Sequence, residues 1–227
     1  MDTLQYRSEY KHEINQGEYV SLLPRLKAIM RPDPHAGPDG CYWVSSLYFD
    51  NADDKALREK LDGLNHREKY RIRAYNGDVS SLRLEKKSKH DGLCLKENAP
   101  ITWEQYQKIL VGDTQFLYNS GVPLLQDFYA KRVIHQLRPR TIVLYRREAF
   151  VYAPGNVRVT IDQDIRTGFG MHNLFDPALV SASAAQHKIL EVKFDEFLPE
   201  IIRDIVQVSN RQSAAFSKYA ACRMASF

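Results

Sequence analysis

Apolar and polar residues alternate along many short stretches of this chain. Alternation with a period of two is typical of strands, and residues 41–50 form a short aromatic and apolar run of the kind found in buried strands. Three hairpin signals, Asn76-Gly77, Asp91-Gly92 and Pro154-Gly155-Asn156, separate some of these stretches. Together these patterns predict strands at residues 6–14, 41–50, 69–75, 81–87, 92–97, 141–152, 157–165 and 188–194.

Helical spacing of apolar residues and helix-start signals, including the one at Thr102, complete the expected elements. They predict helices at residues 17–30, 51–61, from 102 onward, within 114–136, at about 198–208 and at 210–224, with residues 168–185 irregular. Eight strands with helices favour an α+β fold over a parallel α/β sheet. We expect a closed eight-stranded antiparallel β-barrel with helices packed outside. We also expect one domain over residues 1–227, with the C-terminal helices at about 198–224 belonging to it.

Six of the expected strands carry charged residues on one face and apolar residues on the other. A sheet with one face in water explains this pattern for any single strand. Three features of the set favour a different interpretation: its richness in arginine, enough strands to close a barrel, and amphipathic helices that need an apolar surface to cover. The ionic faces would then point inward, with Arg7, Glu9, Lys11 and Glu13; Arg71 and Arg73; Arg83, Glu85 and Lys87; Lys96; Arg158, Thr160, Asp162 and Asp164; Glu191 and Lys193.

A barrel interior lined by arginine and lysine needs a compensating anion, because uncompensated buried charge is costly. The planar guanidinium group fits phosphate oxygens, and lysine adds point charge, so we expect a polyphosphate or triphosphate ligand. The carboxylates Glu9, Glu85, Asp162 and Glu191 would pair with these cations, or one or two of them could hold a divalent metal. Lys218 is either a phosphate ligand or an exposed lysine.

Composition narrows the functional class. A net charge of +4 gives no sign of an outer surface that binds nucleic acid. Three widely spaced cysteines and seven histidines show no zinc-site spacing, and no Ser-His-Asp pattern, GxGxxG or P-loop is present. Neither a signal-peptide core nor an apolar stretch of about 20 residues is found, so we expect a cytoplasmic, soluble protein.

Eight short motifs follow one another from Tyr6 to about Cys222: RSEYKHEI, SSLYFDN, YRIRAY, LEKKSK, LYRREAF, VRVTIDQDI, ILEVKF and FSKY. In this order they resemble the VTC-type polyphosphate polymerase domain of the triphosphate tunnel metalloenzyme (CYTH-like) superfamily. The resemblance implies a tunnel of eight strands. In it, the γ-phosphate of ATP would be transferred to a growing polyphosphate chain with a divalent metal, Mn²⁺ or Mg²⁺.

The resemblance also implies roles for individual residues. It implies phosphate contacts from Lys11, Arg71, Arg73, Lys87, Lys96, Tyr145, Arg147, Arg158, Ser217 and Lys218, and metal binding by Glu191. Five of these are candidate catalytic residues: Arg71, Arg73, Arg147, Arg158 and Lys87. Lys193, on the same face as Glu191, is a further candidate for phosphate binding, and Glu9, Glu85 and Asp162 are further candidates for the metal.

Two departures from the family pattern keep alternatives open. Ala215 stands where the eukaryotic polymerases have lysine, so one phosphate contact would be lost or supplied by Arg211. The segment from Arg7 to Lys11 lies near the ExExK motif of the triphosphatase branch. The alternatives are a polymerase, a triphosphatase acting on inorganic or nucleoside triphosphate, and a non-catalytic binding protein. The family also suggests a membrane-protein partner for product export, whereas we expect no nucleic-acid partner.

Overall fold

The computed structural model describes residues 8–91, 93–169, 173–207 and 216–226. The chain divides into two compact units. The first unit comprises Met1–Trp43, Tyr145–Ile165 and Ala185–Ser217, and the second comprises Val44–Leu144, Arg166–Ala184 and Lys218–Phe227. Strands β3 (Cys41–Asp50), β7 (Arg138–Tyr152) and β8 (Val157–Phe169) contribute residues to both units.

The strands follow the order β1-β10-β8-β7-β3-β4-β5-β6, with β2 paired to β7 and β9 paired to β8. The other bounds are β1 Ser8–Ile14, β2 Arg31–Pro32, β4 Arg67–Tyr75, β5 Asp78–His90, β6 Leu93–Pro100, β9 Val180–Ser183 and β10 Lys188–Phe194. The pairings whose register is described are all antiparallel. The expected antiparallel sheet with helices is thus confirmed.

Closure of the sheet into a barrel is not observed. The strand order is a path that begins at β1 and ends at β6, and within the described ranges no ladder joins these two strands. Over the described residues the sheet also has ten strands where eight were expected. The two additional strands, β2 and β9, have only two and four residues, which is too short for alternation to reveal them. Residues 180–183 therefore correct the expectation that residues 168–185 are irregular.

In the first unit, helices α1 (Gln16–Ile29) and α6 (Glu200–Ile205) cover the apolar face of the strands. Leu22 and Leu26 of α1 and Ile202 of α6 are fully buried against Val159 and Leu190. Helix α1 begins where the sequence predicts because Asn15 and Glu18 form a capping box. The ionic face of β1, β8 and β10 is consequently the face that these helices leave uncovered.

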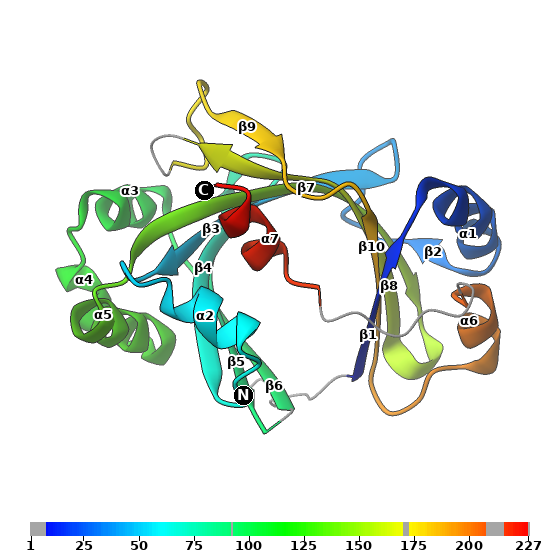
Figure 1. Cartoon of the computed structure of the whole chain (residues 1–227), viewed down its shortest axis with the longest axis horizontal. Helices are drawn as coiled ribbons and strands as arrows, with labels where there is room; N and C mark the ends of the chain where they lie inside the picture. Colours follow the sequence, from blue (N-terminus) through cyan, green and yellow to red (C-terminus); the bar gives the residue numbers. More distant parts are fainter. Residues whose placement is uncertain (1–7, 92, 170–172, 208–215, 227) are drawn as a thin grey trace. The chain divides into compact units, whose positions relative to one another are not determined.

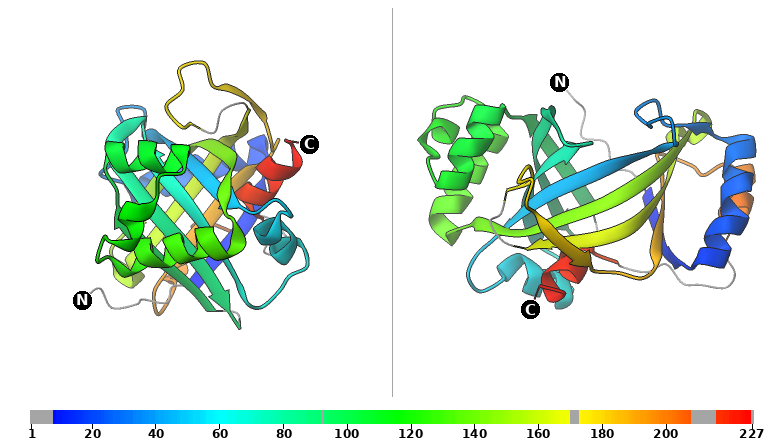
Figure 2. Two further views of the ribbon diagram at one scale, coloured as in Figure 1. Left: turned by 90° about the vertical axis from the view of Figure 1, so that its left-hand side faces the viewer. Right: turned by 90° about the horizontal axis from the view of Figure 1, so that it is seen from above.

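In the second unit, three helices cover the apolar face of β3, β4 and β5: α3 (Trp103–Val111), α4 (Gln115–Tyr118) and α5 (Pro123–His135). Figure 2 shows them stacked against these strands. Tyr106 and Phe128 are buried against Ile72 and Leu84. Thr102 caps α3 as expected, whereas the helix expected within residues 114–136 is divided in two, and the second part begins at Pro123, a residue suited to a first helical turn. The assignment of apolar and ionic faces by alternation is confirmed in this unit.

The last helix, α7 (Lys218–Met224), packs on α2 (Lys55–Leu61) within the second unit (Figure 1). Arg223 donates two hydrogen bonds to Asp54, at 2.8 and 3.0 Å. Tyr219 donates to Asp50, whose carboxylate also accepts from the backbone of Ala56 and Leu57 at the start of α2. This network fixes the position of α7, and hence of Lys218, against β3 and α2. No helix in the described part of the chain is long and apolar enough to span a membrane.

Candidate functional site

Three cations converge on one carboxylate on the ionic face of the second unit. Arg71 contacts Glu85 through Nη2 at 2.6 Å and Nε at 2.7 Å, and Lys96 Nζ lies 2.7 Å from the other carboxylate oxygen. Arg73 Nη1 lies 3.7 Å away. The Glu85 side chain is only 4% exposed. Because one negative charge faces three positive ones, this cluster has an excess of two positive charges.

Further lysines lie beside this cluster on the same strands. In the register of the strands, Lys87 lies opposite Lys69 on β4 and opposite Lys96 on β6. Like charges directly opposite each other destabilise a sheet, so this row favours a bound anion. Burial lowers the pKa of Lys96, as do Arg71 and Arg73, although Glu85 opposes the shift. The face therefore combines a charge excess with partial desolvation, as expected of a phosphate-binding surface.

Aromatic side chains hold Arg71 in place. The Tyr48 hydroxyl accepts a hydrogen bond from Arg71 Nη1 at 2.6 Å, and the Tyr48 ring stacks on Tyr219 of α7 with centroids 4.9 Å apart. Tyr48 carries no signal of this role in the sequence, because it lies in a strand recognised only by its apolar character. Lys218 is the first residue of α7. Ser217 precedes this helix, which corrects the expectation that Ser217 lies within a helix at residues 210–224. Arg7, Arg211 and Ala215 lie outside the described residues.

A second ionic cluster occupies the face of β1, β8 and β10 in the first unit. Glu191 lies opposite Lys11 on β1 and opposite Thr160 on β8. Its carboxylate is 2.5 Å from Lys193 Nζ and 4.0 Å from Lys11 Nζ, and its side chain is 7% exposed. Glu9 pairs with both lysines. Burial alone would lower the pKa of Lys11, but the charges of Glu191 and Glu9 raise it above its ordinary value.

Arg147 and Asp162 form a separate pair in this unit. Arg147 donates from Nε at 2.6 Å and from Nη2 at 2.8 Å to the two oxygens of Asp162, whose side chain is fully buried. The Arg147 guanidinium lies 5.3 Å from the ring centroid of Tyr145. This bidentate contact uses one complete edge of the guanidinium. Both oxygens of Asp162 are occupied, which argues against a role for it in metal binding.

Arg158 is held differently. Its Nη2 donates to the Tyr42 hydroxyl at 2.9 Å and pairs with Asp33 Oδ2 at 2.7 Å. Both contacts use the same nitrogen, and the Arg158 side chain remains 35% exposed. Asp33 and Tyr42 were not among the residues expected from sequence. Asp33 lies in a loop between expected elements, and a hydroxyl in an aromatic strand carries no signal of its partner.

The donors around Glu191 can be compared with what a divalent cation requires. Within the described ranges, no three His, Cys, Asp or Glu residues group as a metal site. A hard cation such as Mg²⁺ is, however, commonly held by one or two carboxylates together with substrate phosphates and water. Glu191, with Glu9 nearby, fits this kind of shared site. Glu85 fits it poorly, because both of its oxygens are paired with cations.

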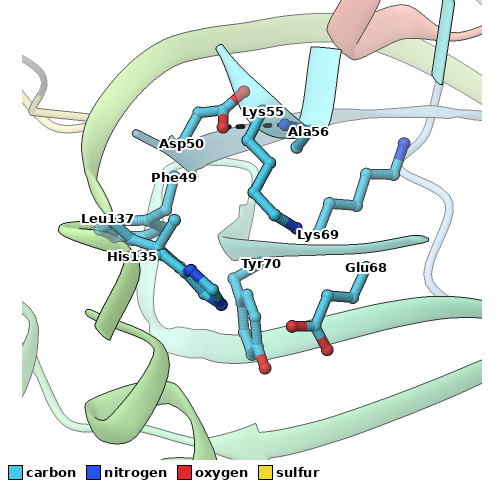
Figure 3. Close-up of a pocket in the computed structure, with 9 residues that line it drawn as sticks. All are labelled: Phe49, Asp50, Lys55, Ala56, Glu68, Lys69, Tyr70, His135 and Leu137. Carbon is cyan, nitrogen blue, oxygen red and sulfur yellow. Dashed lines mark hydrogen bonds between the residues drawn. The ribbon is translucent and has the colours of Figure 1, made fainter. Parts of the chain in front are cut away.

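A pocket in the second unit lies between β3, β4 and the start of α2 (Figure 3). Its lining includes Asp50, Lys55, Glu68 and Tyr70, and its volume is about 20 Å³. A cavity of this size holds about one water molecule. It cannot enclose a nucleotide, so the open ionic faces are better candidates for the binding of a phosphate chain.

The charge environment of Glu85 predicts how stability depends on pH. Burial alone would raise its pKa, but Arg71, Arg73 and Lys96 lower it well below the ordinary value of 4.5. A carboxyl whose pKa falls on folding contributes stability above the pKa of the unfolded chain and loses it as pH falls through the folded value. We therefore expect Glu85→Gln to be less stable than the wild type at pH 7, with a smaller difference at pH 3.5. Urea unfolding at both values measures this, and an unchanged difference would contradict the assigned ion pairs.

Comparison with known proteins places these features in context. The family described as VTC domain matches residues 6–227. The HpAC1 protein of Hippeastrum is 13% identical, with 97% of this chain and 96% of that chain covered at a TM-score of 0.55. The PH1819 protein of Pyrococcus horikoshii is also 13% identical, with 88% and 84% covered at a TM-score of 0.43. A search of curated proteins finds no match. The likeness to HpAC1 supports the fold.

Proposed function

Since the chain belongs to the VTC domain family, we propose that it is a polyphosphate polymerase, which transfers the γ-phosphate of ATP to a growing polyphosphate chain. The main support is the cluster in which Arg71, Arg73 and Lys96 share the single carboxylate of Glu85. Such an excess of positive charge suits a chain of phosphates, whose charge it would neutralise. The domain would extend over residues 1–227.

Phosphoryl transfer depends mainly on alignment and on stabilising the charge of the transition state. In the second unit, Arg71 and Arg73 would bind phosphate oxygens, with Lys87, Lys96 and Lys218 adding positive charge. In the first unit, Arg158, Lys11 and Lys193 would do the same, whereas Arg147, bound to Asp162, would act mostly by maintaining the face. Tyr145 would support Arg147, and Ser217 would donate a hydrogen bond to phosphate.

A divalent metal, Mn²⁺ or Mg²⁺, held at Glu191 with help from Glu9, would neutralise charge on the phosphate oxygens. Lys11 and Lys193 now neutralise Glu191, at 4.0 and 2.5 Å. With a metal held at Glu191, both lysines would be available to contact phosphate. Asp162 is excluded from our proposal for metal binding because Arg147 occupies both of its oxygens.

A triphosphatase is the second candidate. HpAC1, which shares the fold, is described as having a dominant triphosphatase activity. The pairing of Glu9 with Lys11 on β1 is consistent with the ExExK-like reading of this strand. The same residues would then bind the triphosphate while water accepts the phosphoryl group. A non-catalytic polyphosphate-binding protein is the third candidate. We also propose that the protein is cytoplasmic, that a membrane protein receives the product for export, and that nucleic acid is not a partner.

The test is incubation of the purified protein with ATP and Mn²⁺, followed by gel analysis for polyphosphate and an assay for free phosphate. We expect long polymer from the wild type and its loss in Glu191→Gln, because the metal loses its carboxylate. The matched control is Glu196→Gln, an exposed position just after β10, which should retain activity. Free phosphate without polymer would instead identify a triphosphatase. The absence of both products would contradict an enzymatic function.

A further inference from the structure

Asp33 and Tyr42 both act on one arginine of the ionic face in the first unit. Arg158 lies on β8 opposite Lys193 of β10, and Lys193 in turn lies opposite Glu9 of β1. Its Nη2 is held by Asp33 Oδ2 at 2.7 Å and by the Tyr42 hydroxyl at 2.9 Å. Asp33 and Tyr42 are 3% and 5% exposed, respectively, so these partners are buried while the arginine is not.

The loop around Asp33 fixes its carboxylate firmly. Its backbone N–H donates to the carbonyl of Ala149 at 2.9 Å, directly after the short pairing of β2 with β7. The second carboxylate oxygen, Oδ1, accepts from the backbone N–H of His35 at 2.9 Å. Burial alone would raise the pKa of Asp33, but the His35 hydrogen bond and the charge of Arg158 lower it, so the carboxylate is ionised. Asp33 is therefore a fixed negative charge that orients the guanidinium.

The guanidinium held in this way keeps N–H donors for a ligand. Arginine has five N–H donors, and the contacts to Asp33 and Tyr42 account only for those on Nη2. Among the described residues, no acceptor is assigned to Nη1 or Nε. Arg147 differs, because its Nε and Nη2 are both committed to Asp162. Arg158 is thus oriented by buried groups while its Nη1 and Nε donors can still contact phosphate, and its side chain is more exposed than that of Arg147, at 35% against 11%.

We infer that Asp33, assisted by Tyr42, is a positioning residue that orients Arg158 toward a phosphate group of the bound chain. The inference rests on the proposed function, because it assumes a polyanion on this face. A fixed guanidinium loses less conformational entropy on binding than a mobile one. The negative charge of Asp33 by itself would weaken anion binding, so its benefit must come through the geometry of Arg158. Removing the charge of Asp33 would strengthen anion binding if only electrostatics mattered, but would weaken it if Asp33 orients Arg158.

The experiment measures the dissociation constant for inorganic triphosphate by calorimetry, first without metal and then with Mg²⁺. We expect Asp33→Asn to weaken binding by about 5- to 10-fold and Tyr42→Phe to weaken it less, as expected for residues coupled through one partner. In the Arg158→Ala background, Asp33→Asn should have almost no further effect. A merely structural role for Asp33 would produce the same loss in both backgrounds.

The matched control is Asp39→Asn. Asp39 lies in the same connection between β2 and β3 and pairs with Arg146 Nη2, also at 2.7 Å. Arg146 directly precedes Arg147 on β7, so the two arginines lie on opposite faces of the strand. This variant should bind triphosphate as the wild type does. Tighter binding by Asp33→Asn, or equal losses in both backgrounds, would overturn the inference while leaving the function intact. Failure of the wild type itself to bind triphosphate would contradict both, and Tyr42→Phe provides the test should Asp33→Asn not fold.

Discussion

Replacement of Arg71 by alanine is expected to reduce the turnover of ATP by about 100- to 1,000-fold, the usual cost of removing one preorganised donor to a transition-state charge. The fold should survive the change. Glu85 would still have Lys96 at 2.7 Å and Arg73 at 3.7 Å, so its buried carboxylate would keep cationic partners. The measurement is the initial rate of polymer or phosphate formation, with circular dichroism as the check on folding.

Two further variants show whether the loss arises from the geometry of Arg71. Arg71→Lys keeps the charge but cannot reproduce the planar fork that contacts Glu85 and Tyr48, so it should also be impaired. Arg25→Ala removes an arginine on α1 whose contacts are with Ser21, and it should retain full activity. If folded Arg71→Ala turned over ATP as fast as the wild type, the second-unit cluster would not be the site of the reaction.

The local features of this protein could be predicted from sequence better than the non-local ones. The bounds of β3 and β10 agree with the expected residues 41–50 and 188–194, because strand composition and alternation are properties of a single segment. The same holds for the assignment of faces: Ile72 and Leu84 are buried in the core, while Arg71 and Glu85 meet on the other side of the sheet. The ionic faces of β4 and β5 were therefore predictable without knowledge of the fold.

Side-chain partners were harder to predict from sequence, because they depend on register and on loops. Whether Glu85 pairs with Arg71 or holds a metal is decided by the alignment of β4 with β5, which alternation does not determine. Asp33 follows a strand of only two residues, and no periodic pattern marks it. Closure of the sheet is likewise a property of all strands together. The residues proposed to bind phosphate or metal could thus be chosen from sequence, but the residues that orient them could not.

The buried pair of Arg147 and Asp162 gives the largest expected effect on stability. Asp162 is fully buried and Arg147 only 11% exposed, so removal of the acid leaves a guanidinium with little access to water. Burial alone would lower the pKa of Arg147, whereas the charge of Asp162 raises it well above its ordinary value. Breaking a buried pair by removing one partner costs about 3–5 kcal/mol, and we expect this loss for Asp162→Asn in the free energy of unfolding.

Urea unfolding at pH 7 measures this loss, and a double variant distinguishes the cost of an unpaired charge from a general intolerance of change. Replacing both residues with apolar ones, as in Arg147→Met with Asp162→Leu, removes both charges and should recover most of the stability. Asp39→Asn breaks the more exposed contact with Arg146, at 2.7 Å, and should leave the free energy of unfolding almost unchanged. A loss below 1 kcal/mol for Asp162→Asn would mean that water reaches Arg147. In that case phosphate could reach Arg147 as readily as Arg158, and the distinction between the two arginines would have to be abandoned.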